Sequence, residues 1–380
     1  MKKSSPPVSS RVIPCHPAAR PRDPTFSRER LRLDPAVKPR DDRPVKVCPQ
    51  IDYLEHYNRK DPVKFDRPSF ACAENPWQGR DDGQGPERLH QLVQCVSLFK
   101  LREAPPPRFG IVGFCTDEGV RRNKGRPGAR SGPHHLRKAL ANLCFPDSGR
   151  QILDVGDITV KHRHLEEAQN KLGNVVNSLL EWNITPLVLG GGHEIAWGHF
   201  QGLTPHLGGS SLLIINFDAH YDLRPLVKGR GNSGTSFAQI AEYCRAHAQV
   251  FRYLCIGLQE GANTKSLRKN ADAWGVESIW ARDIHLNSPD PLTKIKQAVA
   301  AADKVYLTIC LDVFAQAFAP GVSAPQALGL HPWQVSPLME PILTSGKLLS
   351  FDIAELCPPL DIDQRTAKLA AALVRDVLRQ

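Results

Sequence analysis

Long apolar runs and paired cysteines are both missing from this sequence of 380 residues. No stretch reaches the ~18 consecutive apolar residues that a membrane-spanning helix needs, and the N-terminus has charges but no apolar segment typical of a secretory signal. The ten cysteines are scattered without any C-x-x-C pair, which argues against a disulfide framework and a structural zinc ribbon. We therefore predict a soluble, cytoplasmic protein without a membrane partner.

Basic charge is concentrated at the N-terminus. Residues 1–50 contain 12 Lys/Arg and 5 Asp/Glu, so +7 of the formal net charge of +10 lies there and about +3 remains for the other 330 residues. These 50 residues also hold 10 of the 32 prolines. Because such a segment cannot bury enough apolar surface to order itself, we predict a disordered basic extension over residues 1–70 and one folded domain over residues 71–380.

The extension has two other interpretations, an arm for nucleic acid or an acidic partner and a translation start placed too far upstream. The rest of the chain lacks the interleaved basic and aromatic residues of single-strand binders. We expect no nucleic-acid partner.

Beyond residue 105, short β-rich runs alternate with longer helical patterns. This alternation is typical of βαβ units, and it predicts an α/β fold of three layers (αβα) around a mostly parallel sheet of about eight strands. The main helical patterns occupy 132–143, 165–182, 237–246 and 364–378. The predicted strands are 109–115, 152–155, 186–189, 212–217, 251–258, 277–280, 304–311 and 348–356.

Acidic, imidazole and thiol groups follow four of the predicted strands. In parallel sheets ligands bind beyond the carboxyl ends of the strands, so we expect these groups to converge. Extended backbone would also place alternate side chains of one segment on the same face. The segments are G-G-G-H-E at 190–194, D-A-H-Y-D at 218–222, C-L-D at 310–312 and the strand that ends at Glu355.

Carboxylates and imidazoles crowded on one face repel or desolvate one another unless a cation joins them. A solvated strand end is the alternative for D-A-H-Y-D, and a plain loop histidine is the alternative for G-G-G-H. Six ligand groups are too many for one tetrahedral zinc. They suit two metal ions with shared ligands, and carboxylate-rich sites favour manganese. The six are His193, Asp218, His220, Asp222, Cys310 and Asp312.

Several stretches together resemble the ureohydrolase (arginase) superfamily over about residues 75–380, and most closely its formimidoylglutamase branch of histidine degradation. Besides G-G-G-H-E and D-A-H-x-D, they are N-P-W-Q-G-R-D-D at 75–82, F-C-T-D-E-G-V-R-R-N-K-G-R-P-G-A at 114–129, D-L-R at 222–224, S-G-T-S-F at 233–237 and A-P-G-V-S-A-P at 319–325. The resemblance implies that residues 71–380 form an arginase-like catalytic domain. It also implies a homo-oligomer and a hydrolase with two Mn²⁺ that cleaves N-formimino-L-glutamate to L-glutamate and formamide.

The resemblance also implies roles for individual ligands. His193, Asp218 and Asp222 would hold one ion, and His220 and Asp312 would hold the other, with Asp218 bridging the two.

Two residues carry the implied catalytic roles. Glu355 matches the acid that grips the amidine nitrogens, and a solvated strand-end acid is its other interpretation. Asp222 or a water would carry the proton.

Cys310 departs from the family pattern, which has a metal-bridging aspartate at this position. A thiolate can bind a metal, but it is softer than a carboxylate and offers one donor atom. Manganese should therefore bind less tightly, and zinc or iron should compete better. Lost or reduced activity, a working site with a different metal, and a site little affected all remain open.

Two differences from arginases bear on the substrate. Arg224 stands where arginases have an asparagine near the substrate carboxylate, and a guanidinium suits a dianionic glutamate derivative, although a solvated loop arginine is the other interpretation. Phe237 replaces the histidine of the arginase S-G-N-x-H motif. Asn123 and Thr235 are further candidate substrate contacts.

Two alternative functions remain. One is another ureohydrolase, of the agmatinase or guanidinobutyrase type, and the other is a catalytically silent scaffold.

Overall fold

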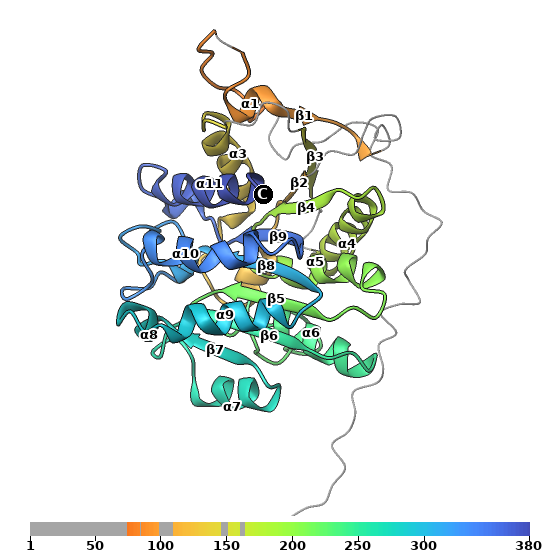
Figure 1. The fold of residues 1–380 in the computed structure, drawn as a ribbon, viewed down its shortest axis with the longest axis vertical. Coiled ribbons are helices and arrows are strands. Elements are labelled where there is room, and N and C mark those ends of the chain that lie inside the picture. Colours follow the sequence, from red (N-terminus) through yellow and green to blue (C-terminus); the bar gives the residue numbers. More distant parts are fainter. Residues whose placement is uncertain (1–73, 84, 99–108, 146–150, 160–163) are drawn as a thin grey trace, which may run out of the picture. The chain divides into compact units, whose positions relative to one another are not determined.

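The computed structural model describes residues 74–83, 85–98, 109–145, 151–159 and 164–380, and the predicted extension over residues 1–70 lies outside them. Within the described residues a nine-stranded sheet has the order β1-β3-β2-β4-β9-β8-β5-β6-β7. Its neighbouring strands pair in parallel, which confirms the predicted α/β class (Figure 1). The strands are β1 (Val93–Cys95), β2 (Phe109–Phe114), β3 (Ile152–Ile158), β4 (Thr185–Leu189), β5 (Leu212–Phe217), β6 (Arg252–Leu258), β7 (Glu277–Trp280), β8 (Lys304–Cys310) and β9 (Leu348–Ala354).

Helices cover both faces of the sheet and complete the predicted three layers (Figure 1). One apolar core holds side chains of α1, α3, α8, α9, α10 and α11, and the other holds side chains of α4, α5, α6 and α7. The helices are α1 (Leu89–Leu92), α2 (Glu118–Arg122), α3 (Gly132–Ala141), α4 (Leu165–Glu181), α5 (Ile195–Leu203), α6 (Ser236–Ala246), α7 (Lys265–Ala273), α8 (Ala281–His285), α9 (Asp290–Ala300), α10 (Pro332–Leu343) and α11 (Arg365–Leu378).

Strand β5 shows how the sequence separates the two cores. Leu213 and Ile215 belong to one core and Leu212 and Ile214 to the other, because successive side chains of a strand point to opposite faces. A strand covered by helices on both faces must be apolar at nearly every position. The L-L-I-I-N-F sequence of β5 meets that requirement except at Asn216.

Strand β1 is the element that the sequence pattern did not predict. It has three residues, V-Q-C, and its burial falls from half-buried to exposed along its length. Among the described strands it pairs with β3 alone, where Val93 lies opposite Ile152. Its sequence carries too little apolar signal for a strand, so its place is set by its partner.

The four central strands β4, β9, β8 and β5 end at nearly the same level. Leu189 of β4 lies opposite Ile353 of β9, and Cys310 of β8 lies opposite Ala354. Strand β5 ends at Phe217, opposite Ile309 of β8. The segments that follow these strands therefore start side by side at the carboxyl edge of the sheet.

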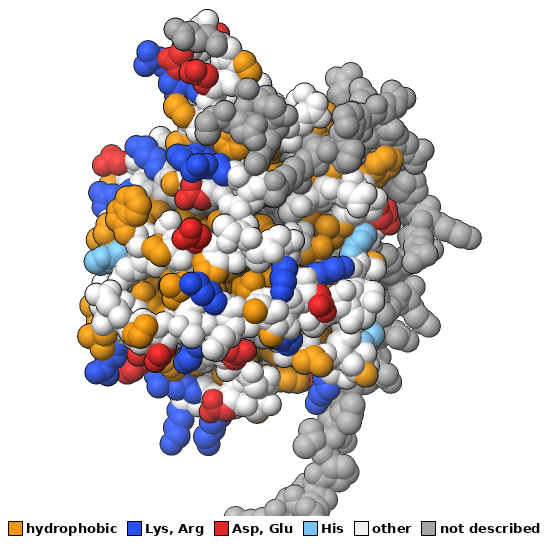
Figure 2. All heavy atoms as spheres, in the orientation of Figure 1, with side chains coloured by type: hydrophobic (Ala, Val, Ile, Leu, Met, Phe, Trp, Pro, Cys, Tyr) orange, Lys and Arg blue, Asp and Glu red, His pale blue; other side chains and the backbone are white. Residues whose placement is uncertain are grey.

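Surface charge and helix length bear on the predictions about nucleic-acid and membrane partners. Basic and acidic side chains are interspersed over the face shown in Figure 2. No helix in the described part of the chain has the length and apolar character needed to cross a membrane.

Candidate metal centre

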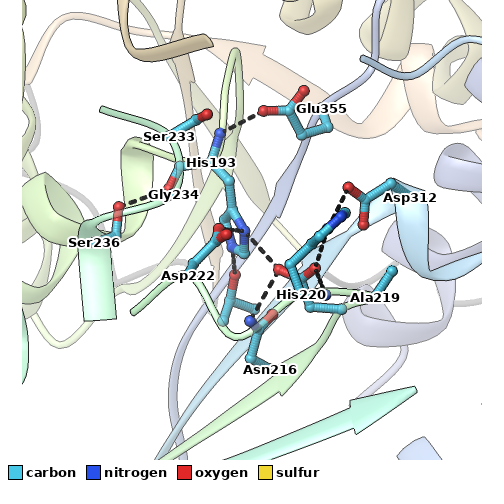
Figure 3. Close-up of polar contacts among 12 residues, drawn as sticks. His193, Asn216, Ala219, His220, Asp222, Ser233, Gly234, Ser236, Asp312 and Glu355 are labelled. Atoms are coloured by element: carbon cyan, nitrogen blue, oxygen red, sulfur yellow. Dashed lines mark hydrogen bonds and ion pairs between the residues drawn. The ribbon is translucent and has the colours of Figure 1, made fainter. Parts of the chain in front are cut away.

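Ligand groups from separate strand ends meet beyond the carboxyl edge of the sheet. Nδ1 of His193 lies 2.9 Å from Oδ2 of Asp218 and 3.1 Å from Oδ2 of Asp222. Nδ1 of His220 lies 3.1 Å from Oδ2 of Asp312 and 3.4 Å from Oδ1 of Asp218. Asp218 thus presents one carboxylate oxygen to each histidine. Figure 3 shows His193 beside Asp222 and His220 beside Asp312.

The donor atoms form two overlapping groups that could each hold a cation. One group contains His193, Asp218 and Cys310, the other contains Asp218, His220 and Asp312, and within each group the ligand atoms lie within 4.8 Å of one another. Asp218 belongs to both, as a bridging ligand would. The resemblance implied Asp222 beside His193 and Asp218, whereas this group contains Cys310, so the division of ligands between two ions stays a prediction.

Buried ligand atoms that have no hydrogen-bond partner in the described structure fit a pair of cations. The contacts of His193 Nδ1 with the two carboxylates lack hydrogen-bond geometry, and this nitrogen has no hydrogen-bond partner among the described residues. Oδ1 of Asp312 is also buried without a partner in the described structure. Buried polar atoms are normally hydrogen-bonded, so atoms left unpaired and directed at other donors are explained by a ligand such as a cation.

The charges of the carboxylates also favour a cation. Burial opposes a charged imidazole at His193, but the carboxylates of Asp218 and Asp222 outweigh it and raise its pKa well above the ordinary range. Burial and the charge of Asp218 raise the pKa of Asp222 to about 6. A carboxylate pair that holds a proton on His193 can hold a metal ion in its place, because metal and proton compete for the same nitrogen.

The triglycine segment lets the His193 loop pass very close to a neighbouring loop. The Gly192 amide donates a hydrogen bond to the carbonyl of Thr116 at 3.1 Å, and a Cβ at Gly191 would lie 1.8 Å from that carbonyl oxygen. The carbonyl of Gly191 accepts from the Glu355 amide at 2.8 Å. Glycine is required here by close backbone approach.

The D-A-H-Y-D segment is not an extended strand, so the prediction that alternation aligns its side chains is corrected. Strand β5 ends at Phe217, and Asp222 has a left-handed backbone with φ of 49°. Side-chain hydrogen bonds fold the segment instead. Oδ1 of Asp218 accepts from the His220 amide at 2.7 Å, and Asn263 accepts from the Tyr221 amide at 3.1 Å.

The same correction applies to C-L-D. Strand β8 ends at Cys310, and Asp312 lies in a short 3-10 helix, Leu311–Val313. The tight turn, not strand alternation, directs Asp312 toward His220.

Cys310 lies inside the ligand cluster, at the position where the family resemblance implies a ligand that bridges the two ions. Burial and the nearby carboxylates of Asp218 and Asp312 raise the pKa of its thiol well above the ordinary value. A bound cation reverses this effect, because a coordinating thiol is deprotonated outright.

The profile of the arginase family matches residues 107–379 of the chain. The chain belongs to the arginase family. The formimidoylglutamase of Clostridium tetani is 42% identical over 320 residues, covering 81% of this chain and 94% of that protein. The formimidoylglutamase of Ralstonia nicotianae is 44% identical over 316 residues, covering 80% and 94%.

Solved structures agree with this assignment. The structure of Trypanosoma cruzi formiminoglutamase with Mn²⁺ is similar with a TM-score of 0.66 at 26% identity, covering 74% of this chain and 97% of that one. The arginase from Bacillus subtilis is similar with a TM-score of 0.61 at 27% identity, covering 72% and 98%. The chain is thus a hydrolase of the arginase family, as the sequence motifs predicted.

A cavity of about 260 Å³ opens beside the ligand cluster of this arginase-family chain. Glu355 lines it, and its Oε1 accepts a hydrogen bond from the His193 amide at 2.9 Å while its Oε2 has no partner among the described residues. Burial and the neighbouring Glu194 raise the pKa of Glu355 well above the ordinary value. Other lining residues are Asn123, His193, His220, Asp222, Arg224, Ser233, Leu267, Cys310, Asp312 and Ser323.

Thr235 does not reach this cavity, and its predicted contact with substrate is corrected. Its side chain is fully buried, where the hydroxyl accepts from the Asn232 amide at 2.8 Å and donates to the Asn232 carbonyl at 2.9 Å. The start of helix α6 uses this hydroxyl. Ser233, two residues earlier, lines the cavity instead and accepts from Asn123 Nδ2 at 3.1 Å.

Sequence reasoning also missed Asp352, which lies below the ligand cluster. It is a fully buried acid in the middle of β9, L-L-S-F-D-I-A. An acid within an apolar strand is a detectable signal, because aspartate is almost never fully buried unless it is paired.

Proposed function

We propose that this arginase-family chain hydrolyses N-formimino-L-glutamate to L-glutamate and formamide at a two-metal site. The observation that carries the proposal is the convergence of the six predicted ligands beyond the carboxyl edge of the sheet, five of them lining one cavity, in a chain more than 40% identical to proteins named formimidoylglutamase. The same convergence supports two ions, with His193 and Asp222 at one, His220 and Asp312 at the other, and Asp218 between them.

When bound, divalent cations would supply the Lewis acidity that makes water nucleophilic near neutral pH. The protein residues orient the substrate around that chemistry. Oε2 of Glu355, buried and unpaired at the cavity, is suited to accept N–H groups of a cationic amidine. The positive charge of the amidine would favour ionised Glu355.

Asp222 is suited to move the proton. It lines the cavity beside the ligand cluster, and a positioned carboxylate can act first as a general base and then as a general acid. In this proposal Asp222 takes a proton from the attacking water and delivers it to the departing glutamate nitrogen.

Arg224 supports the choice of a glutamate derivative. It is exposed and lines the cavity, and no hydrogen bond or ion pair to another described residue engages its guanidinium. The guanidinium of Arg126, by contrast, already donates hydrogen bonds to the carbonyls of Ser323 and Val322 at 2.9 and 2.7 Å. A free guanidinium is suited to a carboxylate through paired hydrogen bonds.

Cys310 bears on the identity of the metal. A soft thiolate beside His193 favours Zn²⁺ or Fe²⁺ over Mn²⁺ at that position, whereas the group of Asp218, His220 and Asp312 contains only oxygen and nitrogen donors. We therefore propose Mn²⁺ as the ion of both groups, with Zn²⁺ or Fe²⁺ as competitors at the Cys310 position.

The test uses the full chain loaded with Mn²⁺, Zn²⁺ or Fe²⁺. It measures formamide and glutamate release from N-formimino-L-glutamate, and urea release from agmatine or 4-guanidinobutyrate. N-formimino-L-glutamate should be cleaved much faster than agmatine or 4-guanidinobutyrate. Arg224→Ala should raise KM for the glutamate derivative at least about tenfold, the value of one charge-assisted contact. Arg130→Ala, at an exposed arginine outside the cavity, serves as the control.

Faster cleavage of agmatine, with no effect of Arg224→Ala, would favour the agmatinase type instead. Absence of turnover with every metal, together with no bound metal, would support a silent scaffold.

A further inference from the structure

A buried polar chain leads from the metal centre into the sheet. Nε2 of His193, the nitrogen on the far side of the ring from the carboxylates, lies 3.0 Å from the Thr308 hydroxyl. That hydroxyl donates to Oδ1 of Asp352 at 2.5 Å. Thr308 and Asp352 are both fully buried, so the chain is shielded from water.

Oδ2 of Asp352 is held by two further groups. The Tyr306 hydroxyl donates to it, and Nδ1 of His199 lies 2.6 Å away. His199 Nε2 contacts the Ser350 hydroxyl, which itself donates to the Pro186 carbonyl at 3.0 Å. Because the single hydroxyl proton of Ser350 is donated to Pro186, its oxygen must accept a hydrogen bond from His199 Nε2–H.

The directions of these bonds fix the proton on His193. The hydroxyl of Thr308 has a single proton, and that proton points to Asp352. Thr308 can then only accept from His193, so Nε2 of His193 carries a hydrogen. When a cation displaces the proton that the carboxylates hold on Nδ1, the lone pair of the ring is therefore on Nδ1, the atom that lies 2.9 Å from Asp218.

We propose that Asp352 is a positioning residue that acts through Thr308 to keep the His193 proton on Nε2 and the Nδ1 lone pair directed at the cation. Metal-binding histidines commonly have such a partner on their second nitrogen, and its loss weakens metal binding about 10- to 100-fold. The inference rests on the metal site of the proposed function but not on the identity of the substrate.

Two substitutions on strand β8 separate this role from simple packing. Thr308→Val and Tyr306→Phe each remove one buried hydroxyl that donates to Asp352, so both should lower the unfolding midpoint. Only Thr308→Val breaks the link to His193. We expect Mn²⁺ to bind about 10- to 100-fold more weakly to Thr308→Val, and within about threefold of the unsubstituted affinity to Tyr306→Phe and Thr308→Ser.

Nitrogen NMR of the imidazole rings gives a readout that needs no metal. In the metal-free full chain, a solvent-protected Nε2–H signal of His193 is expected for the unsubstituted protein and for Thr308→Ser, and it should be lost in Thr308→Val. A protected signal that persists in Thr308→Val would overturn the inference. So would equal loss of Mn²⁺ affinity in Thr308→Val and Tyr306→Phe. Failure of the unsubstituted chain to bind any cation would instead refute the proposed function, while the NMR result would still decide the inference.

Discussion

Arg137 offers the most direct test of how the fold supports the catalytic domain. Its guanidinium is fully buried between helix α3 and strand β3. Nε and Nη2 donate to the two carboxylate oxygens of Asp154 at 2.6 and 2.9 Å, and Nη1 donates to Asp157 at 2.6 Å. Asp154 also accepts from the indole of Trp77 at 2.7 Å, which explains the tryptophan of N-P-W-Q-G-R-D-D.

Arg137→Met keeps the length of the side chain and removes its charge, so Asp154 and Asp157 lose the cation that they share. Breaking a buried ion pair by removing one partner costs about 3–5 kcal/mol, and here one cation serves two acids. We therefore expect the free energy of unfolding to fall by at least about 3 kcal/mol. Lys171→Met, which removes an exposed partner of Glu167, is the control and should cost far less.

Urea unfolding followed by fluorescence and circular dichroism measures both variants, and an unchanged m-value indicates that the same transition is compared. The triple variant Arg137→Met with Asp154→Asn and Asp157→Asn should recover part of the loss, because no buried charge remains. A loss below about 1 kcal/mol for Arg137→Met would show that the network is hydrated or rearranges, and would refute the reasoning.

Three other substitutions or reactions test separate parts of the site and fold. Cys310→Asp should shift competition between Mn²⁺ and Zn²⁺ toward Mn²⁺ at least about tenfold, and an unchanged ratio would place the thiol outside the metal coordination. Gly191→Ala, whose Cβ would lie 1.8 Å from a carbonyl oxygen, should lower both the thermal midpoint and metal content, whereas Gly261→Ala, with open space around it, should change neither. Burial raises the pKa of Cys244 to about 11, so at about pH 8 roughly one thiol in a thousand is ionised. Mass-spectrometric mapping should therefore find Cys244 alkylated far more slowly than the exposed Cys144, and equal rates would contradict its burial.

The fold was largely predictable because a parallel sheet covered on both faces leaves a strong sequence signal. Each buried strand must be apolar at nearly every position, as in β5, and polar residues follow where the central strands end. Strand β1 gave no such signal, because its three residues are mostly exposed.

The ligands of the candidate site were predictable as a set, but the geometry that gathers them was not. Side-chain types at strand ends indicate chemistry without specifying backbone conformation. The fold of D-A-H-Y-D depends on Asn263, which is 41 positions beyond Asp222 and bonds to the backbone of the segment. Thr235 was misplaced for the same reason, since hydrogen bonds to the backbone of Asn232 use a hydroxyl that the sequence alone leaves free.

Two residues at the cavity adopt backbone conformations that L-amino acids avoid. Asp222 has a φ of 49° and Glu355 a φ of 72°, and such left-handed positions cost of order 1–3 kcal/mol outside glycine. A design method that optimises folding stability alone would select glycine at both positions. The resulting protein would be more stable, but it would lack the two carboxylates that we propose for substrate binding and proton transfer. Both positions should therefore be held fixed in such a design.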